Sequence, residues 1–335
     1  MTIYIQSSSD DISTNEVIEW LYYFGHNYIL RINDQHIINH INFEISNTMQ
    51  QLEINQTKID GEFLYWYRRG NFVLNPKLYG MINDNNFKEQ LSLFNYQKKE
   101  INDVIKFISQ DFIYKEGKSI NKIQENDTNK ISNLYLAKHC NINIPHTKVI
   151  SNKDTLLEFA AHHTKIITKP IKFHYFNVKS NAKLLDVFYL TKVLNLKRLT
   201  KIFDKLTNCI VFCPTLFQEY VEKKYEIRVF FLNGKLYPMC IFSQSNIKTK
   251  YDFRHYDFVR PNRLVPYNFE NTFQRKLLNF INKLSMKSGS IDIIVNKNNE
   301  YYFLEVNPIG QFQWLSKACN YFLEKQIAKY YYEQK

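Results

Sequence analysis

The stretch from residue 289 to residue 308, GSIDIIVNKNNEYYFLEVNP, says more about this protein than any other part of the chain. Apolar side chains alternate with other residues on both of its arms, at positions 291, 293 and 295 and again at 301 and 303. Alternation of this kind is typical of β-strands, and the polar residues between the arms are typical of a turn. The stretch therefore predicts a β-hairpin.

The two acids of this hairpin are predicted to face each other. If Asn298 and Asn299 form a two-residue loop, where Asn tolerates positive φ, Asp292 lies opposite Glu305, and Asn307 shares the face of Glu305. Facing carboxylates repel one another, and a cation would remove that repulsion. Carboxylate and amide oxygens are hard ligands that suit Mg²⁺. We therefore expect a metal site here, and we expect Glu305→Ala to hold or raise the melting temperature of the metal-free protein.

The alternative is a surface hairpin with scattered acids. The apolar residues at 293–295 and 303–304 favour a largely buried hairpin instead. Buried carboxylates need partners, so a buried hairpin also favours a metal site.

Composition indicates a globular protein. A chain of 335 residues can bury a large core and is expected to hold two or three domains, and its 44% hydrophobic and 16% aromatic content argues against disorder. No apolar run approaches the roughly 18 residues of a membrane span, and the N-terminus lacks signal-peptide character. The five cysteines form no CxxC pair. We therefore expect a cytoplasmic protein with free thiols and no membrane partner.

The net charge of +12 leaves the partner open. It fits a composition bias with a solvated surface, and it also fits an acidic partner such as nucleic acid, a nucleotide or an Asp/Glu-rich peptide. The segment 250–263 is dense in charged and aromatic residues. It reads as an ordinary polar loop, as a nucleic-acid patch, or as a cradle whose arginines grip the carboxylates of an acidic peptide.

The N-terminal third is predicted to be an open α/β domain. Residues 2–6 and 28–32 read as strands, and a helix between them is expected to start at a capping box of Ser13 and Glu16 and to stop at Gly25. No GxGxxG motif is present, so a dinucleotide site is not expected.

The rest of the chain is predicted to alternate helices and strands after a polar linker. Helices are expected at 131–140, from a cap at Ser151 to about 163, at 272–287 and at 314–330, and strands at 144–150 and 166–170.

A second hairpin is predicted at Asn233-Gly234. Its register places Glu226 and Arg228 on one strand face, away from Ile227 and Val229. The alternative for these two residues is an exposed ion pair on a sheet edge.

Two lysines are candidates for phosphate binding. Lys130 precedes a predicted helix and Lys169 ends a predicted strand. Their ammonium groups could neutralise phosphates, although with 44 basic residues in the chain each could equally be a solvated surface lysine.

These motifs together resemble a family. Asp292, followed after about a dozen residues by Glu-x-Asn-Pro, resembles the metal-binding end of the ATP-grasp ligases. The continuation at 303–314, FLEVNPIGQFQW, is similar to the narrower group that cyclises ribosomal peptides of the microviridin or graspetide kind, including "grasp-with-spasm" maturases. The segment 64–70, LYWYRRG, also resembles the N-terminal domain of that group. The likeness covers essentially the whole chain and is weakest at 171–200.

The resemblance implies an α/β fold of the α+β ATP-grasp type. It implies a pre-ATP-grasp-like, open α/β domain at 1–115, a linker at 116–130, a small central α/β subdomain at 131–212, and a C-terminal ATP-grasp subdomain with an antiparallel sheet and the metal site at 213–335. Many ATP-grasp proteins carry a glycine-rich phosphate lid after the strand that ends at Lys169. Here residues 171–179 contain no glycine, so Lys172, His174 and Lys179 are expected in its place.

The resemblance also implies roles for single residues, with ATP and Mg²⁺ as cofactors. The metal would be held by Asp292, Glu305 and Asn307. ATP would be bound by Lys130, Lys169, Gln218, Glu219, Tyr220, Val221 and, at the ribose, Glu226. The residues closest to the chemistry would be Arg228, at the transferring phosphate, and Arg254. The peptide would be bound by Arg68, Arg69, Asp252, Arg254, Arg260 and Arg263.

The activity implied is that of a peptide macrocyclase. Asp or Glu side chains of a ribosomal precursor peptide, with a leader and a Ser/Thr/Asp/Glu-rich core, would be activated as acyl phosphates and joined to Ser/Thr hydroxyls or Lys amines. The first alternative is a RimK-like ATP-grasp ligase that adds a free amino acid to a peptide or protein. The second is a non-catalytic, basic nucleic-acid-binding protein, although no nucleic-acid partner is expected. The oligomeric state stays open, with a homodimer as one expectation.

Overall fold

The computed structural model describes residues 2–33, 36–48, 50–59, 63–70, 72–75, 87–108, 119–121, 128–171, 175–180, 183–188, 191–206, 210–255 and 257–334. The chain divides into two compact units. Unit 1 comprises Met1–Asn126, Gln311–Ser316 and Phe322–Lys335, and unit 2 comprises Asp127–Gly310 and Lys317–Tyr321. Two C-terminal segments thus group with the N-terminal unit, whereas the sequence prediction assigned all of 213–335 to one subdomain. The other domain boundaries stay predictions.

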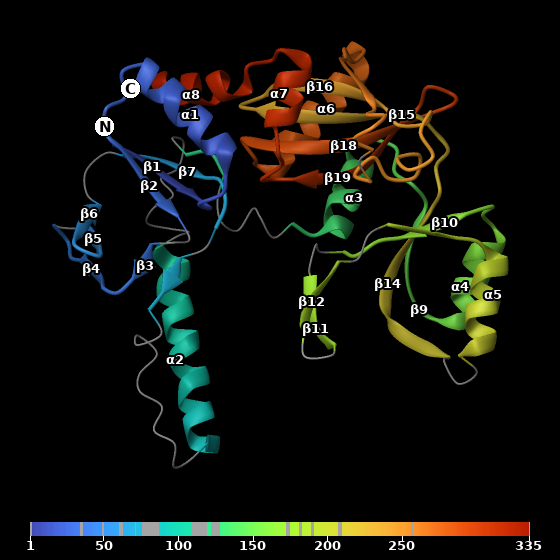
Figure 1. Ribbon diagram of the computed structural model, residues 1–335, viewed down its shortest axis with the longest axis horizontal. Helices are drawn as coiled ribbons and strands as arrows, with labels where there is room; N and C mark the ends of the chain where they lie inside the picture. The colour runs from blue at the N-terminus through green and yellow to red at the C-terminus, as the bar shows by residue number, and fades with distance from the viewer. Residues whose placement is uncertain are drawn as a thin grey trace. The chain divides into compact units, whose positions relative to one another are not determined.

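Unit 1 contains an open parallel sheet, as predicted. Its strand order is β2-β1-β7, with both neighbours parallel to β1. Helix α1 connects β1 to β2 and lies beside α8 (Figure 1). Near the sheet, the Tyr331 hydroxyl donates a hydrogen bond to the Tyr65 carbonyl oxygen at 2.9 Å, which ties the C-terminus to this unit. The elements are β1 (Thr2–Ser7), α1 (Ile12–Tyr23), β2 (Ile29–Asn33), β7 (Phe63–Tyr67) and α8 (Leu323–Tyr332).

The predicted capping box of α1 is wrong. The helix begins at Ile12, one residue before Ser13, and its N-cap is Asp11. The Ser13 and Thr14 hydroxyls donate hydrogen bonds to the Asp11 carboxylate. The remaining elements of unit 1 are β3 (Ile37–Ile38), β4 (Ile41–Ile45), β5 (Gln50–Ile54), β6 (Thr57–Ile59), β8 (Val73–Leu74) and α2 (Phe87–Phe107).

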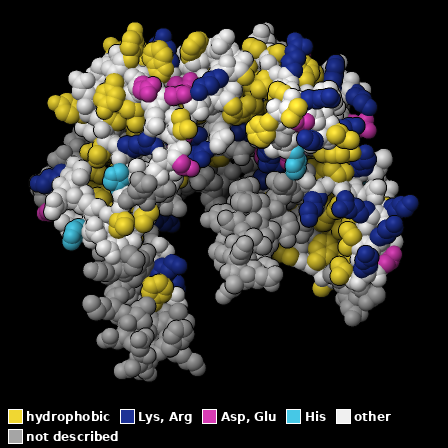
Figure 2. All heavy atoms as spheres, viewed as in Figure 1, with side chains coloured by type: hydrophobic (Ala, Val, Ile, Leu, Met, Phe, Trp, Pro, Cys, Tyr) yellow, Lys and Arg dark blue, Asp and Glu magenta, His cyan; other side chains and the backbone are white. Residues whose placement is uncertain are grey.

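A four-stranded sheet in unit 2 has the strand order β13-β10-β14-β9. Helices α4 and α5 bury their apolar faces against it, and Lys and Arg side chains gather over these helices on the outside (Figure 2). Helix α4 is capped by Asn152, whose side chain accepts the Thr155 N–H, and not by the predicted Ser151. The elements are α3 (Lys130–His139), β9 (Thr147–Asn152), α4 (Lys153–Ala161), β10 (Ile166–Thr168), β13 (Lys192–Leu194), α5 (Leu196–Lys205) and β14 (Val211–Glu219), with a separate hairpin of β11 (Tyr175–Ser180) and β12 (Lys183–Phe188).

A five-stranded antiparallel sheet in unit 2 has the order β17-β16-β15-β18-β19. Helices α3 and α6 pack against one of its faces, where they form the main hydrophobic core with Ile227, Val229, Ile291 and Ile293. The opposite face is therefore left for polar side chains. The elements are β15 (Lys223–Leu232), β16 (Lys235–Phe242), β17 (Arg263–Pro266), α6 (Asn271–Leu284), β18 (Ser288–Asn296) and β19 (Tyr301–Asn307).

The last predicted helix is broken in two. Helix α7 covers Gln313–Cys319, and α8 starts only at Leu323. Between them Asn320 and Phe322 have φ values of +54° and +50°, which a continuing right-handed helix does not allow. None of the described helices is long and apolar enough to cross a membrane.

The register of the Asn233-Gly234 hairpin is confirmed. Glu226 pairs with Ile241 and Arg228 with Met239, while Asn233 and Gly234 both have positive φ, as a tight hairpin turn requires. The alternative of an exposed pair on a sheet edge is wrong, because β15 lies at the centre of the sheet and Glu226 and Arg228 are only 7% and 8% exposed.

The facing of Asp292 and Glu305 is confirmed as well, but by a different route. The hairpin loop is one residue longer than predicted: the Asn296 N–H bonds the Glu300 carbonyl oxygen, and Asn299 alone has a φ of +63°. A β-bulge between Asp292 and Ile293 then shifts the register back. Two one-residue differences cancel, so the acids meet where the shorter loop would have placed them.

Candidate functional site

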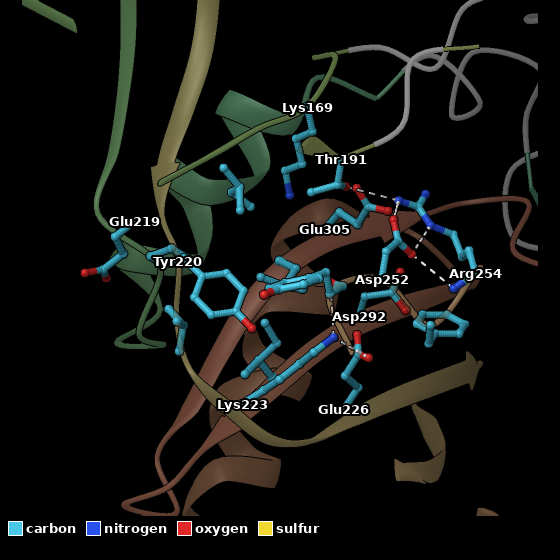
Figure 3. A pocket seen from close by; sticks show the side chains of 17 residues that line it. Lys169, Thr191, Glu219, Tyr220, Lys223, Glu226, Asp252, Arg254, Asp292 and Glu305 are labelled. Atoms are coloured by element: carbon cyan, nitrogen blue, oxygen red, sulfur yellow. Dashed lines mark hydrogen bonds and ion pairs between the residues drawn. The ribbon is translucent and has the colours of Figure 1, made fainter. Parts of the chain in front are cut away.

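A cavity in unit 2 gathers many of the predicted site residues (Figure 3). It opens on the polar face of the five-stranded sheet and on the end of β10. The predicted residues that line it are Lys169, Glu219, Tyr220, Val221, Glu226, Asp252, Arg254, Asp292 and Glu305. The lining residues that were not predicted are Pro145, Ile167, Thr191, Lys223, Tyr251, Phe253, Ile294 and Leu304.

The facing carboxylates are held by cations. Nη1 of Arg228 donates to both oxygens of Asp292 at 2.7 Å, and the Lys130 ammonium lies 3.3 Å from Oε2 of Glu305. Burial alone would raise the pKa of Glu305, but Lys169, Lys130 and Arg254 lower it to about 2. Burial raises the pKa of Asp292, with Arg228 opposing and the charge of Glu305 adding to the rise.

These contacts argue for the opposite of one expectation from the sequence. Glu305 was expected to be a source of repulsion whose removal would hold or raise the melting temperature. Its lowered pKa shows that the attraction of the surrounding lysines and arginines outweighs both burial and the repulsion of Asp292. Removing Glu305 should therefore destabilise the protein.

The donor set fits Mg²⁺. Asp292 and Glu305 offer hard carboxylate oxygens, and the Asn307 amide lies 3.4 Å from Oδ2 of Asp292. A carboxylate has about four lone-pair directions, so Asp292 can bind a cation while it still accepts from Arg228. Within the described ranges, no three His, Cys, Asp or Glu side chains form a metal cluster. A cation here would therefore complete its shell with water and phosphate oxygens, which is how Mg²⁺ is usually bound.

Both predicted phosphate-binding lysines extend toward the end of the cavity that holds Asp292 and Glu305. Lys130 stands at the first position of α3 and donates to the Pro170 carbonyl oxygen at 2.9 Å, which places it beside the end of β10. Lys169 follows β10 and points into the cavity (Figure 3). Burial lowers the pKa of Lys169, while Glu305 opposes the shift. The two ammonium groups and Glu305 thus form one charge cluster.

A buried carboxylate, Glu226, lies in another part of the cavity. It accepts hydrogen bonds from the Lys223 ammonium and the Ser243 hydroxyl, both at 2.7 Å. Burial raises its pKa, and Lys223 opposes the rise. Beside it, the rings of Tyr220 and Tyr251 lie 5.7 Å apart between centroids, and burial raises the pKa of Tyr220 to about 12. The Glu226 carboxylate can thus accept hydrogen bonds from ligand hydroxyls, and the two tyrosine rings beside it offer a flat apolar surface.

Gln218 and Glu219 direct their side chains elsewhere. The Gln218 amide donates to the Thr147 hydroxyl at 2.8 Å, and this residue does not line the cavity. The Glu219 carboxylate accepts the His146 N–H at 2.9 Å, lies 3.9 Å from Nδ1 of His163, and points away from the cavity (Figure 3). Any contact of Glu219 with a ligand in the cavity would involve its backbone.

The predicted peptide cradle is represented in the cavity by Asp252 and Arg254. Arg254 donates to both oxygens of Asp252, at 2.8 and 2.6 Å, and to the Thr191 hydroxyl at 3.4 Å. The hydrogen bond to Asp252 raises the pKa of Arg254. Arg260 and Arg263 do not line the cavity: Arg260 is exposed, and Arg263 lies 5.5 Å from the Phe242 ring centroid.

Comparison with known proteins identifies the architecture. No protein-family model matches the sequence, and no curated protein matches it. A solved structure, the RiPP-associated ATP-grasp ligase of Chryseobacterium gregarium in complex with ADP and a leader and core peptide, superposes with a TM-score of 0.75 at 24% identity, covering 100% of this chain and 96% of that one. The macrocyclase MdnC bound with precursor peptide MdnA, from Microcystis aeruginosa, has a TM-score of 0.71 at 22% identity, with 98% of each chain covered.

The chain has the ATP-grasp fold. A third structure agrees, the ATP-grasp ligase PsnB complexed with a precursor variant, Mg and ADP, at a TM-score of 0.70 and 15% identity over 100% of this chain and 98% of that one. The fold expected from Asp292, Glu305 and the Glu-x-Asn-Pro motif is thereby confirmed. The prediction that Lys172, His174 and Lys179 replace the ATP-grasp lid concerns side chains that lie outside the described residues.

Arg68 and Arg69 belong to unit 1 and line a hollow of their own. Arg68 is 3% exposed, pairs with Asp11 through Nε at 3.1 Å, and lies 5.2 Å from the Phe312 ring centroid. Burial lowers its pKa to about 10. The side chain of Arg69 is 34% exposed. Of the two arginines, Arg69 is therefore the one that an external ligand can reach.

The residues that sequence reasoning missed share one property. Lys223 and Tyr251 belong to this ATP-grasp cavity because of what packs around them: Lys223 stands in no motif, and Tyr251 lies in the segment 250–263 but was given no role of its own. Lys223 is next to Lys224, and the structure buries the first and exposes the second. The side chain at 223 shares a strand face with Arg228 only after the bulge near Tyr225, so simple alternation would not have found it.

Proposed function

We propose that this protein is an ATP-dependent peptide ligase that closes rings within a ribosomal precursor peptide. The observation that carries the proposal is the cavity of unit 2, where Asp292 and Glu305 face each other among Lys130, Lys169 and Arg254. Hard oxygen ligands mixed with cations suit a metal-bound nucleoside triphosphate. The ATP-grasp fold, and the ADP and precursor peptides named for structures that share it, support the same two substrates.

The proposed reaction has two steps. A carboxylate oxygen of an Asp or Glu side chain in the peptide attacks the γ-phosphorus of ATP, the bond to ADP breaks with its electron pair leaving on ADP, and an acyl phosphate forms. A Ser or Thr hydroxyl or a Lys amine of the same peptide then attacks the acyl carbon. It loses its proton and displaces phosphate, which closes an ω-ester or ω-amide ring.

The residues of the cavity divide the work of positioning between them. Lys130 and Lys169 hold the phosphates, and Glu226 accepts from the ribose hydroxyls. Mg²⁺ bound by Asp292, Glu305 and Asn307 supplies neutralisation of the phosphate charge. Phosphoryl transfer of this kind depends mainly on alignment and charge, so the enzyme itself needs no nucleophile.

Two arginines serve the acyl intermediate. Arg228 donates to Asp292 through Nη1 and does not itself line the cavity. We propose that its guanidinium, held beside Asp292, stabilises the oxyanion. Arg254 is oriented by Asp252 and Thr191 and presents its 44% exposed side chain to the peptide acid. In unit 1, Arg69 is proposed as a further contact for peptide carboxylates, with Arg68 behind it.

A direct test is ring formation on a short, acid-rich precursor peptide, to be sought as an open reading frame beside the gene. Mixed with the protein, ATP and Mg²⁺, the peptide should lose one water for each ring, measured by mass spectrometry. A peptide whose acidic acceptors are changed to Asn or Gln has no acid to phosphorylate, so each change should remove one dehydration. Undiminished water loss from the amide peptide would contradict the acyl-phosphate route, and addition of a free amino acid would favour the RimK-like alternative.

Arg254 can be tested against a neighbour in the same loop. Arg254→Ala should slow peptide processing more than it weakens ATP binding, because the side chain lines the cavity. Arg260→Ala is the matched control, since Arg260 lies outside the cavity. Equal effects of the two alanine variants would remove Arg254 from the proposed site.

Peptide affinity should also fall with added salt, because exposed charge pairs are screened over about 8–10 Å near physiological ionic strength.

A further inference from the structure

The buried Glu226–Lys223 pair is connected to more than the cavity wall. The Lys223 side chain is only 2% exposed, and its ammonium donates to Oε1 of Glu226 at 2.7 Å and to the backbone carbonyl oxygen of Tyr251 at 3.2 Å. Lys223 therefore joins a carboxylate on the central strand β15 to the backbone of Tyr251, which lies 28 residues after Lys223 in the chain. A buried ammonium with only charged and carbonyl acceptors is held firmly, because leaving either acceptor would cost desolvation without compensation.

Residues 243–255, which we call the 243–255 loop, are fastened to the same carboxylate a second time. The Ser243 hydroxyl at the start of the loop donates to Oε1 of Glu226 at 2.7 Å, and Ser243 is fully buried. Thr249 is 1% exposed, and its hydroxyl oxygen lies 3.0 Å from the Ser243 carbonyl oxygen and 2.9 Å from Oδ1 of Asn262, so its one proton can be donated to either. One carboxylate oxygen thus receives both anchors of the loop.

The loop carries side chains that line both parts of the cavity. Tyr251 faces Tyr220 near Glu226, whereas Asp252 and Arg254 reach the end that holds Asp292 and Glu305 (Figure 3). The carbonyl that Lys223 holds belongs to Tyr251, directly before Asp252. A change at Glu226 would therefore be transmitted to the residue that orients Arg254.

We infer that Lys223 is a positioning residue that couples occupancy of the nucleotide site at Glu226 to the order of the 243–255 loop and its Arg254. The inference rests on the proposed function, because it takes Glu226 as the ribose ligand. A ligand hydroxyl that donates to Glu226 restrains the carboxylate, and Lys223 and Ser243 pass that restraint to both ends of the loop. Nucleotide binding would then prepare Arg254 for the peptide acid.

Hydrogen–deuterium exchange of the full-length protein, with and without Mg·ADP, tests this coupling without any peptide. In the wild-type protein, Mg·ADP should slow amide exchange in the 243–255 loop by about fivefold or more, because the loop opens less often when its anchors are restrained. In Lys223→Met, which removes the ammonium but keeps the length of the side chain, this slowing should fall below about twofold. Binding of Mg·ADP, measured by calorimetry at saturating concentrations, ensures that both proteins are compared in the bound state.

Lys224→Met is the matched control. Lys224 is the next residue on β15, is exposed, and donates to Asn299 in the hairpin loop and not to Glu226. Its substitution removes the same charge and should leave the ADP-induced slowing as large as in the wild type. If Lys224→Met reduces it as much as Lys223→Met does, the effect comes from net charge and the inference is overturned.

Ser243→Ala keeps the inference testable if Lys223→Met fails to fold. It removes one hydroxyl, leaves the Lys223–Glu226 pair in place, and should lose about half of the ADP-induced slowing because one of two anchors remains. Unchanged slowing in whichever of these two variants folds would overturn the inference. If Mg·ADP does not bind even the wild-type protein, the proposed function fails and the inference with it, whereas binding with loop protection that does not depend on Lys223 defeats only the inference.

Discussion

Arg68 pairs with Asp11 in unit 1 and Arg228 pairs with Asp292 in unit 2, and the two pairs differ in what surrounds them. The first pair is almost fully buried, at 3% and 5% side-chain exposure, and the Phe312 ring lies over the guanidinium. The second is 10% and 14% exposed and opens on a cavity. Both are arginine–aspartate contacts of about hydrogen-bond length, so distance alone does not separate them.

The charges around each pair do separate them. Around Arg228 and Asp292 stand a second carboxylate, Glu305, and further cations, so that no charge has a single partner. Charges arranged in this way leave positive potential for a phosphate and acidic oxygens for a metal. Asp11 instead lies 3.1 Å from Arg68 and 3.7 Å from Arg69, accepts hydrogen bonds from the Ser13 and Thr14 hydroxyls, and occupies the N-cap position of α1, with no second carboxylate among these partners. We therefore propose a role in the reaction for the pair of unit 2 and a mainly structural role for the pair of unit 1.

The largest effect is expected from Glu305→Ala. Turnover of ATP with peptide should be abolished, because the change removes a metal ligand and the partner of Lys130 and Lys169. The free energy of unfolding should fall by about 1–3 kcal/mol, since buried cations are left without their acceptor. Glu300→Ala, at the exposed end of the same hairpin, is the control for both measurements. Full turnover, or a higher melting temperature, would contradict the role assigned to Glu305.

Arg68→Ala should be the most damaging change in unit 1. Removing one partner of a buried pair typically costs about 3–5 kcal/mol, and here Asp11 would keep only the more distant Arg69, at 3.7 Å, and the hydroxyls of Ser13 and Thr14. Urea unfolding measures the loss. Arg69→Ala is the matched control, and for this partly exposed neighbour we expect less than about 1 kcal/mol. Similar losses for the two variants would show that Arg68 has no special structural role and would break the contrast between the two pairs.

Lys169→Ala should act on the nucleotide and spare the fold. Loss of one charged contact to phosphate costs about 1.5–3 kcal/mol, which corresponds to roughly a ten- to hundredfold weaker affinity. Calorimetric titration with Mg·ATP gives the dissociation constant, and Lys138→Ala on the exposed side of α3 serves as control. An unchanged constant would reduce Lys169 to a lysine that only neutralises Glu305.

The smallest effect is expected from acid titration, which measures how the contribution of Glu305 to the unfolding free energy depends on pH. Its pKa in the folded protein is lowered to about 2, so it stabilises the fold at pH values above the ordinary glutamate pKa and loses this contribution as the pH falls toward 2. The difference in unfolding free energy between the wild type and Glu305→Gln should therefore be constant above about pH 5 and shrink below it. A difference that grows on acidification would mean that Glu305 is destabilised by Asp292, as the sequence alone suggested.

Local motifs predicted the strand faces well and the helix ends poorly. Glu226 and Arg228 were placed correctly because a tight turn at Asn233 sets the register of a whole hairpin. The predicted caps at Ser13 and Ser151 were wrong by two residues and one residue: the Asn152 side chain caps α4, and Asp11 occupies the N-cap position of α1 without a side-chain hydrogen bond to the helix backbone. A cap depends on which side chain finds a free N–H, and neighbouring polar residues make that choice ambiguous in sequence.

The pairing of Asp292 with Glu305 depends on a β-bulge that the sequence did not predict. The sequence by itself determined the register of the Asn233-Gly234 hairpin and the position of Lys130 at the start of a helix. These follow from the period of two along a strand and from turn and cap chemistry, which act over a few residues. Only the tertiary structure decided which neighbouring charge is buried: Lys223 and not Lys224, Arg68 more than Arg69, and Glu219 turned toward His146. Burial depends on what distant segments bring, such as the Tyr251 carbonyl oxygen or the Phe312 ring. Local pattern contains no information about those partners.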